Sequence, residues 1–381
     1  MFFTSKSENP IGLDISDLSL KMVQLKNKGE KIKIQAIGGI HLPKGTIENG
    51  EIKKADDMIS AINKILSEPK FGKFSSNEIV ACLPENRTFI KLIQAGSNTD
   101  IPSFVPDEIE KHIPASADEL YLDWQIIERS MQNSLVLVGA APKTIVDQYS
   151  LLFEHMKYSI LAFEIEPVAM CRSLLLEENP KFRGELNKNY VILDIGARRT
   201  NLTLYSKDTI LFSISIPISG NEITNLIAER LEISHEQAEK AKIVCGLDES
   251  KAQGVIKSIL SDMIASLSAK IRESIDYYNN HFSDRGPINK IILSGGGANI
   301  KNLNNILKEQ TLIETVIGDP LVNINEKREF FDGVFSETHL IQGPKNKNKP
   351  IDIQGEVEQG NETSYTTSIG LALREIFNKD L

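Results

Sequence analysis

The sequence predicts an α/β protein of two similar lobes with a cleft between them. Its 381 residues exceed the roughly 100 to 200 of one domain, so we expect at least two packed units. Two segments, 10–43 and 190–220, share the order strand, aspartate, turn, strand, polar turn, strand. A third segment, 290–310, runs from an apolar strand through three glycines into a helical pattern. The duplication implies that each lobe presents an aspartate-bearing hairpin tip to the cleft.

The first unit begins with a strand that ends at Asp14. A short turn, residues 15–18, leads to a second strand at 19–26, and a polar turn leads to a third at 31–41. Lysine and apolar residues alternate at the start of this third segment. Because successive side chains of a strand point to opposite faces, the alternation predicts a strand.

The second unit repeats this plan from residue 190. Its first strand ends at Asp194, 180 positions after Asp14, and strands at 200–205 and 209–218 follow. Small residues in such a turn let backbone N–H groups approach an anion, while the carboxylate can hold a metal ion through water. One Asp-Ile-Gly tripeptide is an ordinary turn, but two copies at matching positions favour a phosphate site.

The third segment places Gly295, Gly296 and Gly297 between a strand at 290–293 and a helix at 299–310. Consecutive glycines permit a ligand to approach the backbone closely, with a helix N-terminus nearby. Taken alone, the loop is equally consistent with a flexible turn. Its position after the second aspartate hairpin makes it a candidate part of the same site.

Other regions are informative about structure rather than chemistry. Ser234 and Gln237 form a capping-box pattern that predicts a helix start, and 255–282 carries the apolar stripe of a packed helix. The segment 330–362 lacks helical periodicity, and its lysines between Pro344 and Pro350 predict a solvated loop. Contact of this loop with a membrane surface or a partner is the alternative.

Composition excludes several classes of protein. With 41% hydrophobic and 25% charged residues, the chain is in the ordinary globular range. A net charge of −9 argues against broad binding to nucleic acid or anionic lipid. Three cysteines, far apart in the sequence, predict neither a disulfide framework nor a zinc site. No apolar stretch is long enough for a membrane span and no signal peptide is present, so we expect a soluble cytoplasmic protein.

The order of these motifs resembles the actin-like ATPases, which include the Hsp70 ATPase domain, sugar kinases and the cell-division protein FtsA. Within them the chain is similar to the PilM family, cytoplasmic actin-like proteins of type IV pilus assembly. The segments that carry the resemblance are 11–14, 21–25, 42–45, 50–52, 113–114, 120–127, 164–167, 194–197, 239–242, 294–298 and 364–373. They span nearly the whole chain, and their order is more specific than any one of them.

The resemblance implies an actin-like two-lobed ATPase fold of duplicated ribonuclease-H-like lobes, with a subdomain inserted in the first lobe. The implied first lobe comprises residues 1–84, 166–186 and 365–381 around an inserted subdomain at 85–165. The implied second lobe comprises residues 187–219 and 288–364 around a helical subdomain at 220–287.

The resemblance also implies ATP and Mg²⁺ as cofactors. Asp14 and Asp194 would hold the magnesium shell, and Lys21 would reach toward a phosphate. The other implied nucleotide contacts are Ser16 in the first loop, Gly196, Ala197, Arg198 and Thr200 in the second, Gly295, Gly296 and Gly297 at the base and sugar, and Glu239 and Lys242 at the ribose and adenine. Without the resemblance, Glu239 and Lys242 are best interpreted as a surface ion pair one helical turn apart.

Glu166, which precedes Pro167, resembles the acidic residue that positions water or metal in this superfamily, and it is the candidate catalytic residue. A glutamate before proline is otherwise common in the first turn of a helix, near the positive end of the dipole. Both interpretations stay open from the sequence.

The hairpin tips depart from the family pattern. Ser16, Asp17 and Leu18 stand where the family has glycine and small hydroxyl residues, and Arg198 and Arg199 stand where small hydroxyl residues are common. In one alternative an arginine contacts a phosphate, worth about 1.5 to 3 kcal/mol. In the other, Asp17 pairs with an arginine across the cleft, worth about 0 to 1 kcal/mol when exposed. These magnitudes favour retained ATP binding with slow or negligible hydrolysis.

The resemblance implies an adaptor at the inner face of the cytoplasmic membrane. Its expected partner is the N-terminal cytoplasmic segment of a PilN-like membrane protein, bound in a groove between the first lobe and the inserted subdomain. Other pilus assembly proteins and a second copy of the chain are further expected partners, and nucleic acid is not one. Trp124 would anchor this interface or, as the residues alone favour, pack in a core. The alternative functions are an FtsA-like filament-forming ATPase and a small-molecule kinase of the same superfamily.

Overall fold

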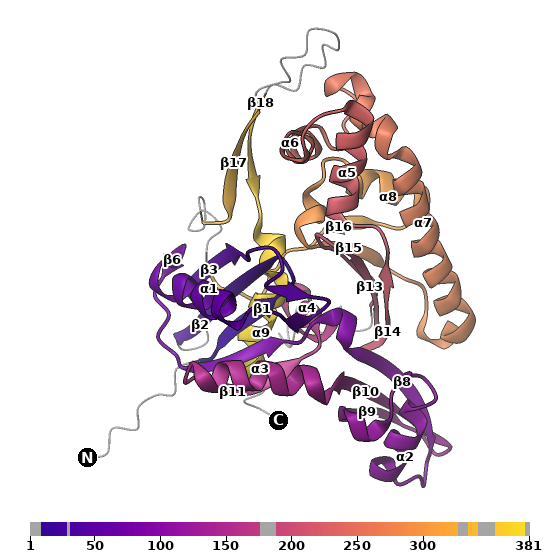
Figure 1. The fold of residues 1–381 in the computed structure, drawn as a ribbon. Coiled ribbons are helices and arrows are strands. Elements are labelled where there is room, and N and C mark those ends of the chain that lie inside the picture. Colours follow the sequence, from indigo (N-terminus) through magenta and orange to yellow (C-terminus); the bar gives the residue numbers. More distant parts are fainter. Residues whose placement is uncertain (1–8, 29–30, 176–187, 327–333, 342–354, 378–381) are drawn as a thin grey trace.

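The computed structural model describes residues 9–28, 31–175, 188–326, 334–341 and 355–377. Two sheets, of six and eight strands, dominate it. Figure 1 shows two lobes, one mainly in indigo to purple and one in red to orange, while the strands within residues 89–142, which belong to the second sheet, are purple. The strand and helix bounds reproduce the duplicated order that the sequence predicts.

The first sheet has the order β11-β7-β1-β2-β3-β6. Its strands are β1 (Ile11–Ile15), β2 (Ser19–Lys28), β3 (Lys31–His41), β6 (Phe71–Gly72), β7 (Glu78–Cys82) and β11 (Ser159–Glu164). The three N-terminal strands form an antiparallel meander, and β7 and β11 continue from β1 in parallel. This sheet therefore combines a local meander with two crossover strands.

The second sheet repeats that pattern in the order β16-β15-β12-β13-β14 and then continues into β8-β10-β9. Its strands are β12 (Asn189–Ile195), β13 (Thr200–Ser206), β14 (Thr209–Ile216), β15 (Lys290–Ser294), β16 (Thr315–Ile317), β8 (Phe89–Gly96), β9 (Leu120–Arg129) and β10 (Asn133–Pro142). The meander is again antiparallel, with β15 parallel to β12. The duplication seen in the sequence is thus a duplication of sheet topology.

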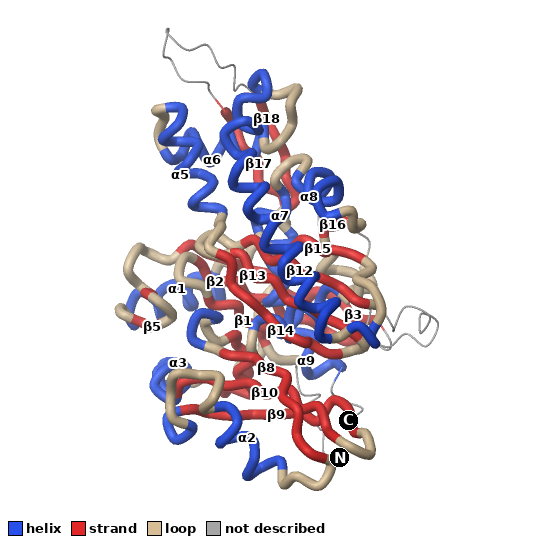
Figure 2. Tube along the Cα trace, turned by 90° about the vertical axis from the view of Figure 1, so that its right-hand side faces the viewer, coloured by secondary structure: helices blue, strands red, loops and turns tan. Residues whose placement is uncertain are grey.

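The inserted strands join the second lobe rather than the first. Phe212 on β14 pairs with Lys91 on β8, so one continuous sheet runs from β16 to β9, as Figure 2 shows. The range 85–165, predicted as the insert, contains two kinds of element. Strands β8 to β10 and helix α2 form the insert, whereas α3 and β11 pack in the first lobe because their apolar faces join its core.

Helices cover both sheets. The α-helices are α1 (Ala55–Ser67), α2 (Ile101–Ile109), α3 (Lys143–His155), α4 (Glu166–Leu174), α5 (Gly220–Leu231), α6 (His235–Cys245), α7 (Val255–His281), α8 (Leu303–Thr311) and α9 (Thr366–Phe377). Short 3-10 helices include η1 (Glu85–Arg87), η6 (Gly296–Asn299) and η8 (Glu362–Tyr365). The predicted capping box of Ser234 and Gln237 is present at the start of α6, and α7 matches the predicted packed helix.

Helix α9 returns from the C-terminal end of the chain to pack between β1 and α4 (Figure 1). Two glycines make this packing possible. A Cβ on Gly12 would lie 2.2 Å from the Ser368 carbonyl oxygen, and a Cβ on Gly370 would lie 1.8 Å from that of Ala169. Since no side chain fits at either position, the first lobe depends on both glycines to accept its last helix.

The remaining strands form two small hairpins, β4 (Ile47–Glu48) with β5 (Glu51–Ile52), and β17 (Ser336–Ile341) with β18 (Gly355–Gly360). The second hairpin lies within the segment that the sequence predicts as a loop. The lysines between Pro344 and Pro350 lie outside the described residues.

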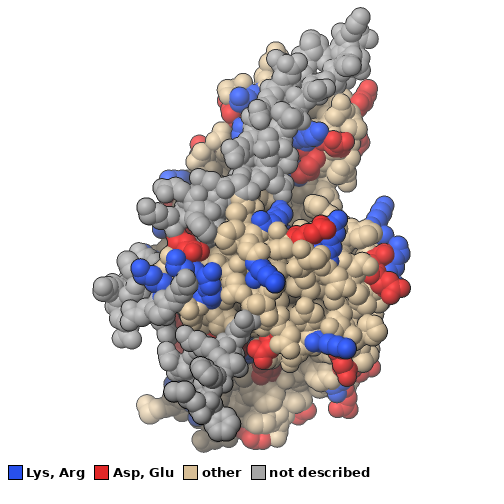
Figure 3. All heavy atoms as spheres, turned by 90° about the vertical axis from the view of Figure 1, so that its left-hand side faces the viewer, with Lys and Arg blue, Asp and Glu red and all other residues tan. Residues whose placement is uncertain are grey.

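On the part of the surface that is described, Figure 3 shows lysine, arginine, aspartate and glutamate side chains interspersed on one face. Among the described helices, none combines the length and apolar character needed to cross a bilayer.

Candidate functional site

The ends of β1 and β12 place two aspartates at equivalent positions. Asp14 pairs in register with Lys21 on β2, and Asp194 pairs in register with Asn201 on β13. In both hairpins the partner lies seven residues after the aspartate. The lobes therefore present the same hairpin, with a lysine in one copy and an asparagine in the other.

The two aspartates interact electrostatically with each other and with Lys21. Lys21 Nζ lies 3.5 Å from Asp14 Oδ2, and Ser294 hydrogen-bonds to Asp194. Burial, together with the negative charge of Asp14, raises the pKa of Asp194 to about 6. The two carboxylates are close enough to repel each other, so a cation between them would be stabilised.

Two further carboxyl groups lie beside them. Glu166 begins α4, and Thr367 Oγ1 donates a hydrogen bond to its Oε1 at 3.1 Å. Glu85 in η1 accepts a hydrogen bond from Asn201 Nδ2 and shares another with Glu166. Burial and then the charge of Asp194 raise the pKa of Glu85 to about 8, and burial and then Glu85 raise the pKa of Glu166 well above its usual range. Burial and neighbouring negative charge therefore disfavour the ionised form of both groups.

The residues present fit a hydrated magnesium ion. Mg²⁺ prefers carboxylate oxygens and usually keeps several of its waters. Asn201 Oδ1 is buried, and no described residue hydrogen-bonds to it, which suits a metal-bound water as donor. Among the described residues, no three His, Cys, Asp or Glu side chains are grouped closely enough to ligate a metal directly. Asp14 and Asp194 would therefore hold the ion through water.

The hairpin tips differ in how they use their backbone N–H groups. In the first tip, Ser16 Oγ accepts hydrogen bonds from Ser19 N at 3.0 Å and Leu18 N at 3.4 Å. In the second tip, no hydrogen bond within the described structure uses the N–H groups of Ala197 and Arg198. Only the second tip thus keeps adjacent backbone donors available for an anion.

Asp17 and Arg198 form an ion pair across the cleft. Asp17 also accepts a hydrogen bond from Gly50 N at 3.2 Å, while the Arg198 side chain is 44% exposed. Of the two alternatives that the sequence leaves open, the structure contains the interlobe pair. Because the arginine is partly exposed, we assign this pair about 0 to 1 kcal/mol.

Gly196 and Thr200 shape the second loop. The Thr200 hydroxyl is buried and donates to the Ile218 carbonyl at 2.6 Å, so it supports the loop from beneath. Gly196 N donates to Arg199 O at 2.9 Å, and Gly196 O accepts from Gly220 N, at the first turn of α5, at 2.9 Å. The loop is therefore held rigidly against the N-terminus of α5.

The triglycine loop packs directly against the second aspartate. Gly295 has φ of +76°, and a Cβ there would lie 2.7 Å from Asp194 Oδ1. A Cβ on Gly297 would lie 2.2 Å from Ile195 Cγ2, whereas a Cβ on Gly296 would meet nothing within 4 Å. Two glycines are thus required by packing, and the exposed Gly296 is the one with open space for a ligand.

Glu239 and Lys242 lie on α6 beside the second loop. Lys242 Nζ donates to Glu239 Oε2 at 2.6 Å, to Thr224 Oγ1 at 2.9 Å and to Gly220 O at 3.2 Å. Lys242 is buried, so the interpretation of this pair as a surface ion pair is wrong. The ammonium group lies close to the loop because α5 and α6 pack together.

Comparison with known proteins assigns the chain to a family. A family model described as type IV pilus assembly protein PilM matches residues 12–341, most of the chain. The chain belongs to the PilM family. The two-lobed topology and the equivalent aspartate hairpins are the features of the structure that accompany this match.

Relatives and solved structures agree on the fold of this PilM family member. Cell division protein FtsA of Buchnera aphidicola subsp. Baizongia pistaciae is 25% identical over 328 residues, 75% of this chain and 78% of the relative. A PilM-PilN type IV pilus biogenesis complex matches with a TM-score of 0.74 at 20% identity, covering 97% of this chain and 98% of the other. MreB5 of Spiroplasma citri bound to AMPPNP matches at 0.51 and 14% identity, covering 86% and 96%. The fold is the actin-like ATPase fold.

A groove of about 330 Å³ lies between the first lobe and the inserted strands of this PilM family protein. The edge strand β9 forms one wall with Tyr121 to Gln125, and Ile165 and Val168 contribute to the other. Trp124 packs on the core of the insert and also lines the groove. Its location therefore agrees both with a core aromatic residue and with a residue at the groove surface. The groove is thus mainly apolar, beside an open strand edge.

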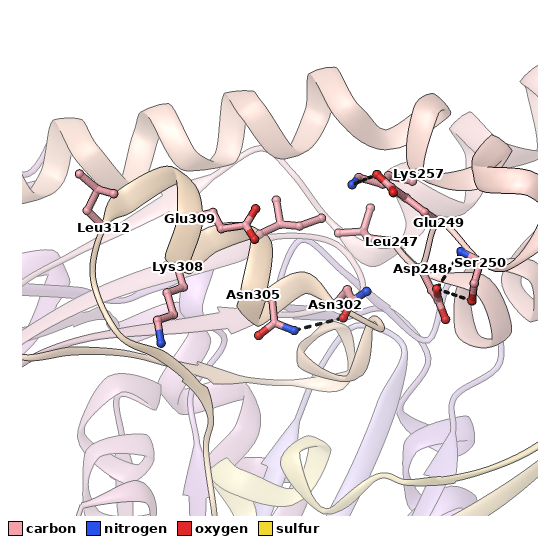
Figure 4. Close-up of a pocket in the computed structure, with 11 residues that line it drawn as sticks. Leu247, Asp248, Glu249, Ser250, Lys257, Asn302, Asn305, Lys308, Glu309 and Leu312 are labelled. Carbon is pink, nitrogen blue, oxygen red and sulfur yellow. Dashed lines mark hydrogen bonds and ion pairs between the residues drawn. The ribbon is translucent and has the colours of Figure 1, made fainter.

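A second hollow, of about 990 Å³, lies between the segment that follows α6, the start of α7 and helix α8 (Figure 4). Its polar side chains already have partners. Lys257 Nζ lies 2.5 Å from Glu249 Oε1, Asp248 accepts from Ser250, and Asn305 donates to Asn302. Because no cleft carboxylate lines it, we do not assign the nucleotide to this hollow.

Two functional candidates were missed in the sequence. Glu85 lies in the acidic cluster, but no spacing marks it, since its partner Asn201 is 116 residues away. Arg374 lines the groove and lies 2.8 Å from Glu164 Oε1. The only sequence signal for either was its position near a predicted element. Glu85 lies shortly after the strand that ends at Cys82, and Arg374 lies on the helix assigned to the first lobe.

Proposed function

We propose that this PilM family protein is an adaptor of type IV pilus assembly that binds ATP with Mg²⁺ in its cleft and hydrolyses it slowly or negligibly. Its partner in this proposal is the N-terminal cytoplasmic segment of a PilN-like membrane protein. The observation that carries the proposal is the pair of equivalent aspartates that face each other next to a triglycine loop. The MreB5 match, a structure bound to AMPPNP, adds support for a nucleotide.

Five of the predicted cofactor residues have a role in this proposal. Magnesium would neutralise phosphate charge, and Asp14 and Asp194 would orient its waters. Lys21 would contact a phosphate, as would the N–H groups of Ala197 and Arg198.

Arg198 can serve this site only if it leaves Asp17. A charge-assisted contact with phosphate is worth about 1.5 to 3 kcal/mol, more than the about 0 to 1 kcal/mol of the exposed pair. Nucleotide would therefore displace the interlobe pair, which biases the empty cleft toward closure without blocking it.

Slow hydrolysis follows from the raised pKa of Glu166, which disfavours its ionised form. A general base must be ionised to accept a proton from water, and burial and neighbouring negative charge raise the pKa of Glu166 well above its usual range. A protonated Glu166 can orient water through a hydrogen bond but cannot deprotonate it.

The groove supports the adaptor role. Strand β9 is the last strand of the eight-stranded sheet, so an extended peptide can add to its edge through backbone hydrogen bonds while apolar side chains enter the groove. The match to a PilM-PilN complex supports a PilN-like segment as the peptide. Through such a partner the protein would associate with the membrane, and other pilus proteins or a second copy would bind elsewhere.

Isothermal titration calorimetry tests both parts of the proposal, nucleotide binding and peptide binding. ATP with Mg²⁺ should bind the wild-type chain, and Asp194→Asn should weaken binding at least about tenfold. An N-terminal PilN-like peptide should also bind, and Trp124→Ala should weaken it about thirtyfold if Trp124 is an anchor. Leu312→Ala, at a remote side chain that is 90% exposed, is the matched control. No heat with either ligand on the wild-type chain would overturn the corresponding half.

The FtsA relatives favour one second candidate, a filament-forming ATPase. Filaments in negative-stain microscopy with ATP and Mg²⁺, without binding of the peptide, would favour this candidate over the adaptor.

A further inference from the structure

Three segments of the protein each extend from the cleft to the groove. In the first, Glu85 faces the cleft between groove residues Leu83 and Ile90. In the second, Glu166 faces the cleft between groove residues Ile165 and Val168. The third is α9, in which Thr367 contacts Glu166 and Arg374 lines the groove. The two sites are therefore the two ends of the same short elements.

Glu85 is the residue that joins these segments to the opposite lobe. Its carboxyl group accepts a hydrogen bond from Asn201 on β13 of the second lobe and shares another with Glu166. The Asn201 side chain is buried and its Oδ1 has no hydrogen-bond partner in the described structure. A group that enters the cleft at Asn201 thus meets the Glu85 contact directly.

We propose that Glu85 is a positioning residue that couples the cleft to the groove, so that magnesium nucleotide bound in one changes peptide affinity in the other. The contact of Glu85 with Asn201 and Glu166 fixes the segment from Leu83 to Ile90, which leads from the first-lobe wall of the groove into inserted strand β8. This inference rests on the proposed function, because it names the regulation of the two sites assigned there.

Packing makes the coupling direct. A Cβ on Gly139, in the groove wall on β10, would lie 2.9 Å from Ile165 Cδ1, so Ile165 is already in close contact with the inserted strands. Close-packed interiors transmit displacements of this kind rather than absorb them. A nucleotide shifts the groove only by binding one arrangement of the Glu85 contact better than another.

Trp124 provides a readout that needs no ligand. It is the only tryptophan of the chain, so acrylamide quenching of its fluorescence reports on the groove that it lines and on the insert core against which it packs. We expect Glu85→Ala and Asn201→Ala to change this quenching relative to the wild-type chain. Glu85→Gln should keep the wild-type value, because its amide can accept from Asn201 and donate to Glu166.

The controls are matched in side-chain type and remote from both sites. Glu249→Ala and Asn305→Ala alter residues of the hollow in Figure 4 and should leave Trp124 quenching unchanged. Thermal unfolding of each variant establishes that the compared proteins are folded. Equal quenching in the wild type, Glu85→Ala and Asn201→Ala would overturn the proposal, as would an equal change in the controls.

Ligand titrations measure the coupling itself. Peptide affinity with and without ADP and Mg²⁺ should differ about fivefold or more in the wild-type chain, and by linkage the peptide should change nucleotide affinity by the same factor. In Glu85→Ala the factor should fall to near one while each ligand still binds, and Glu85→Gln should restore it. A factor of one in the wild-type chain with both ligands bound would overturn the coupling. Failure of either ligand to bind would instead overturn the proposed function, and the ligand-free Trp124 measurement would then decide the role of Glu85.

Discussion

The two hairpin tips have the same topology but meet an anion differently. Both end in an aspartate whose register partner lies seven residues on. In the first tip the Ser16 side chain occupies the backbone donors, and Asp17 adds negative charge. In the second, the N–H groups of Ala197 and Arg198 stay available within the described structure. Duplicated topology therefore conserves where the carboxylates lie, while the tip residues decide which hairpin can hold phosphate.

The two tips also differ in how firmly they are held. The second loop is packed by the triglycine loop and by the N-terminus of α5. The first is held by its own turn and by the contact of Asp17 with Gly50. We therefore expect the second lobe to supply the preformed half of the nucleotide site, and four measurements can test this asymmetry.

The largest expected effect is on nucleotide affinity and comes from replacing either of the two aspartates. Asp14→Asn and Asp194→Asn should each weaken magnesium-dependent ATP binding by about 10 to 100-fold, since in the proposed site each carboxylate would orient waters of the ion. Calorimetry with and without Mg²⁺ measures the loss. Equal affinity of both variants and the wild-type chain would show that the hairpins do not share one ion.

The next effect tests the packing of the second tip. Gly297→Ala should lower the free energy of unfolding by about 1 to 3 kcal/mol, because its Cβ would overlap Ile195. Gly296→Ala, one residue away in open space, should change it by less than about 0.5 kcal/mol. Denaturant unfolding of both variants is the measurement, and equal losses would contradict the assigned packing.

The third prediction concerns the pH dependence of stability. We expect its effect to be smaller than that of Gly297→Ala and larger than that of Asp17→Asn. Burial and neighbouring charge raise the pKa of Glu85 from 4.5 to about 8, so the folded protein binds a proton that the unfolded chain has released. Its contribution therefore lowers stability as pH rises from about 4.5 through about 8. Thermal unfolding of the nucleotide-free protein should show this slope, Glu85→Gln should flatten it, and Glu249→Gln should keep it.

The smallest effect concerns the interlobe pair. Asp17→Asn removes both the competitor for Arg198 and a negative charge near the phosphate site, so ATP should bind up to about fivefold more tightly, equivalent to about 1 kcal/mol. Calorimetry at low and high salt measures it. Weaker binding in this variant would mean that Asp17 helps to hold the nucleotide.

Much of the cleft was predictable from the sequence, because its elements are local. Alternating residues and polar turns predict the strands around Asp14 and Asp194, and the run Gly295 to Gly297 between strand and helix patterns predicts the loop beside them. The burial of Lys242 was not predictable, since a glutamate three residues before a lysine has the same spacing on an exposed helix. Neither was the support role of the Thr200 hydroxyl, which follows from the path of Ile218.

The sequence by itself determined the duplicated hairpins, the positions of their aspartates and the glycines that allow close packing, because turn chemistry and strand alternation act between neighbours in the chain. Only the tertiary structure decided that Glu85 contacts Asn201, that Asp17 pairs with Arg198, and that β8 extends the sheet of the second lobe. These contacts join residues more than 100 positions apart. Their formation depends on the burial and docking of whole lobes, which no local pattern encodes.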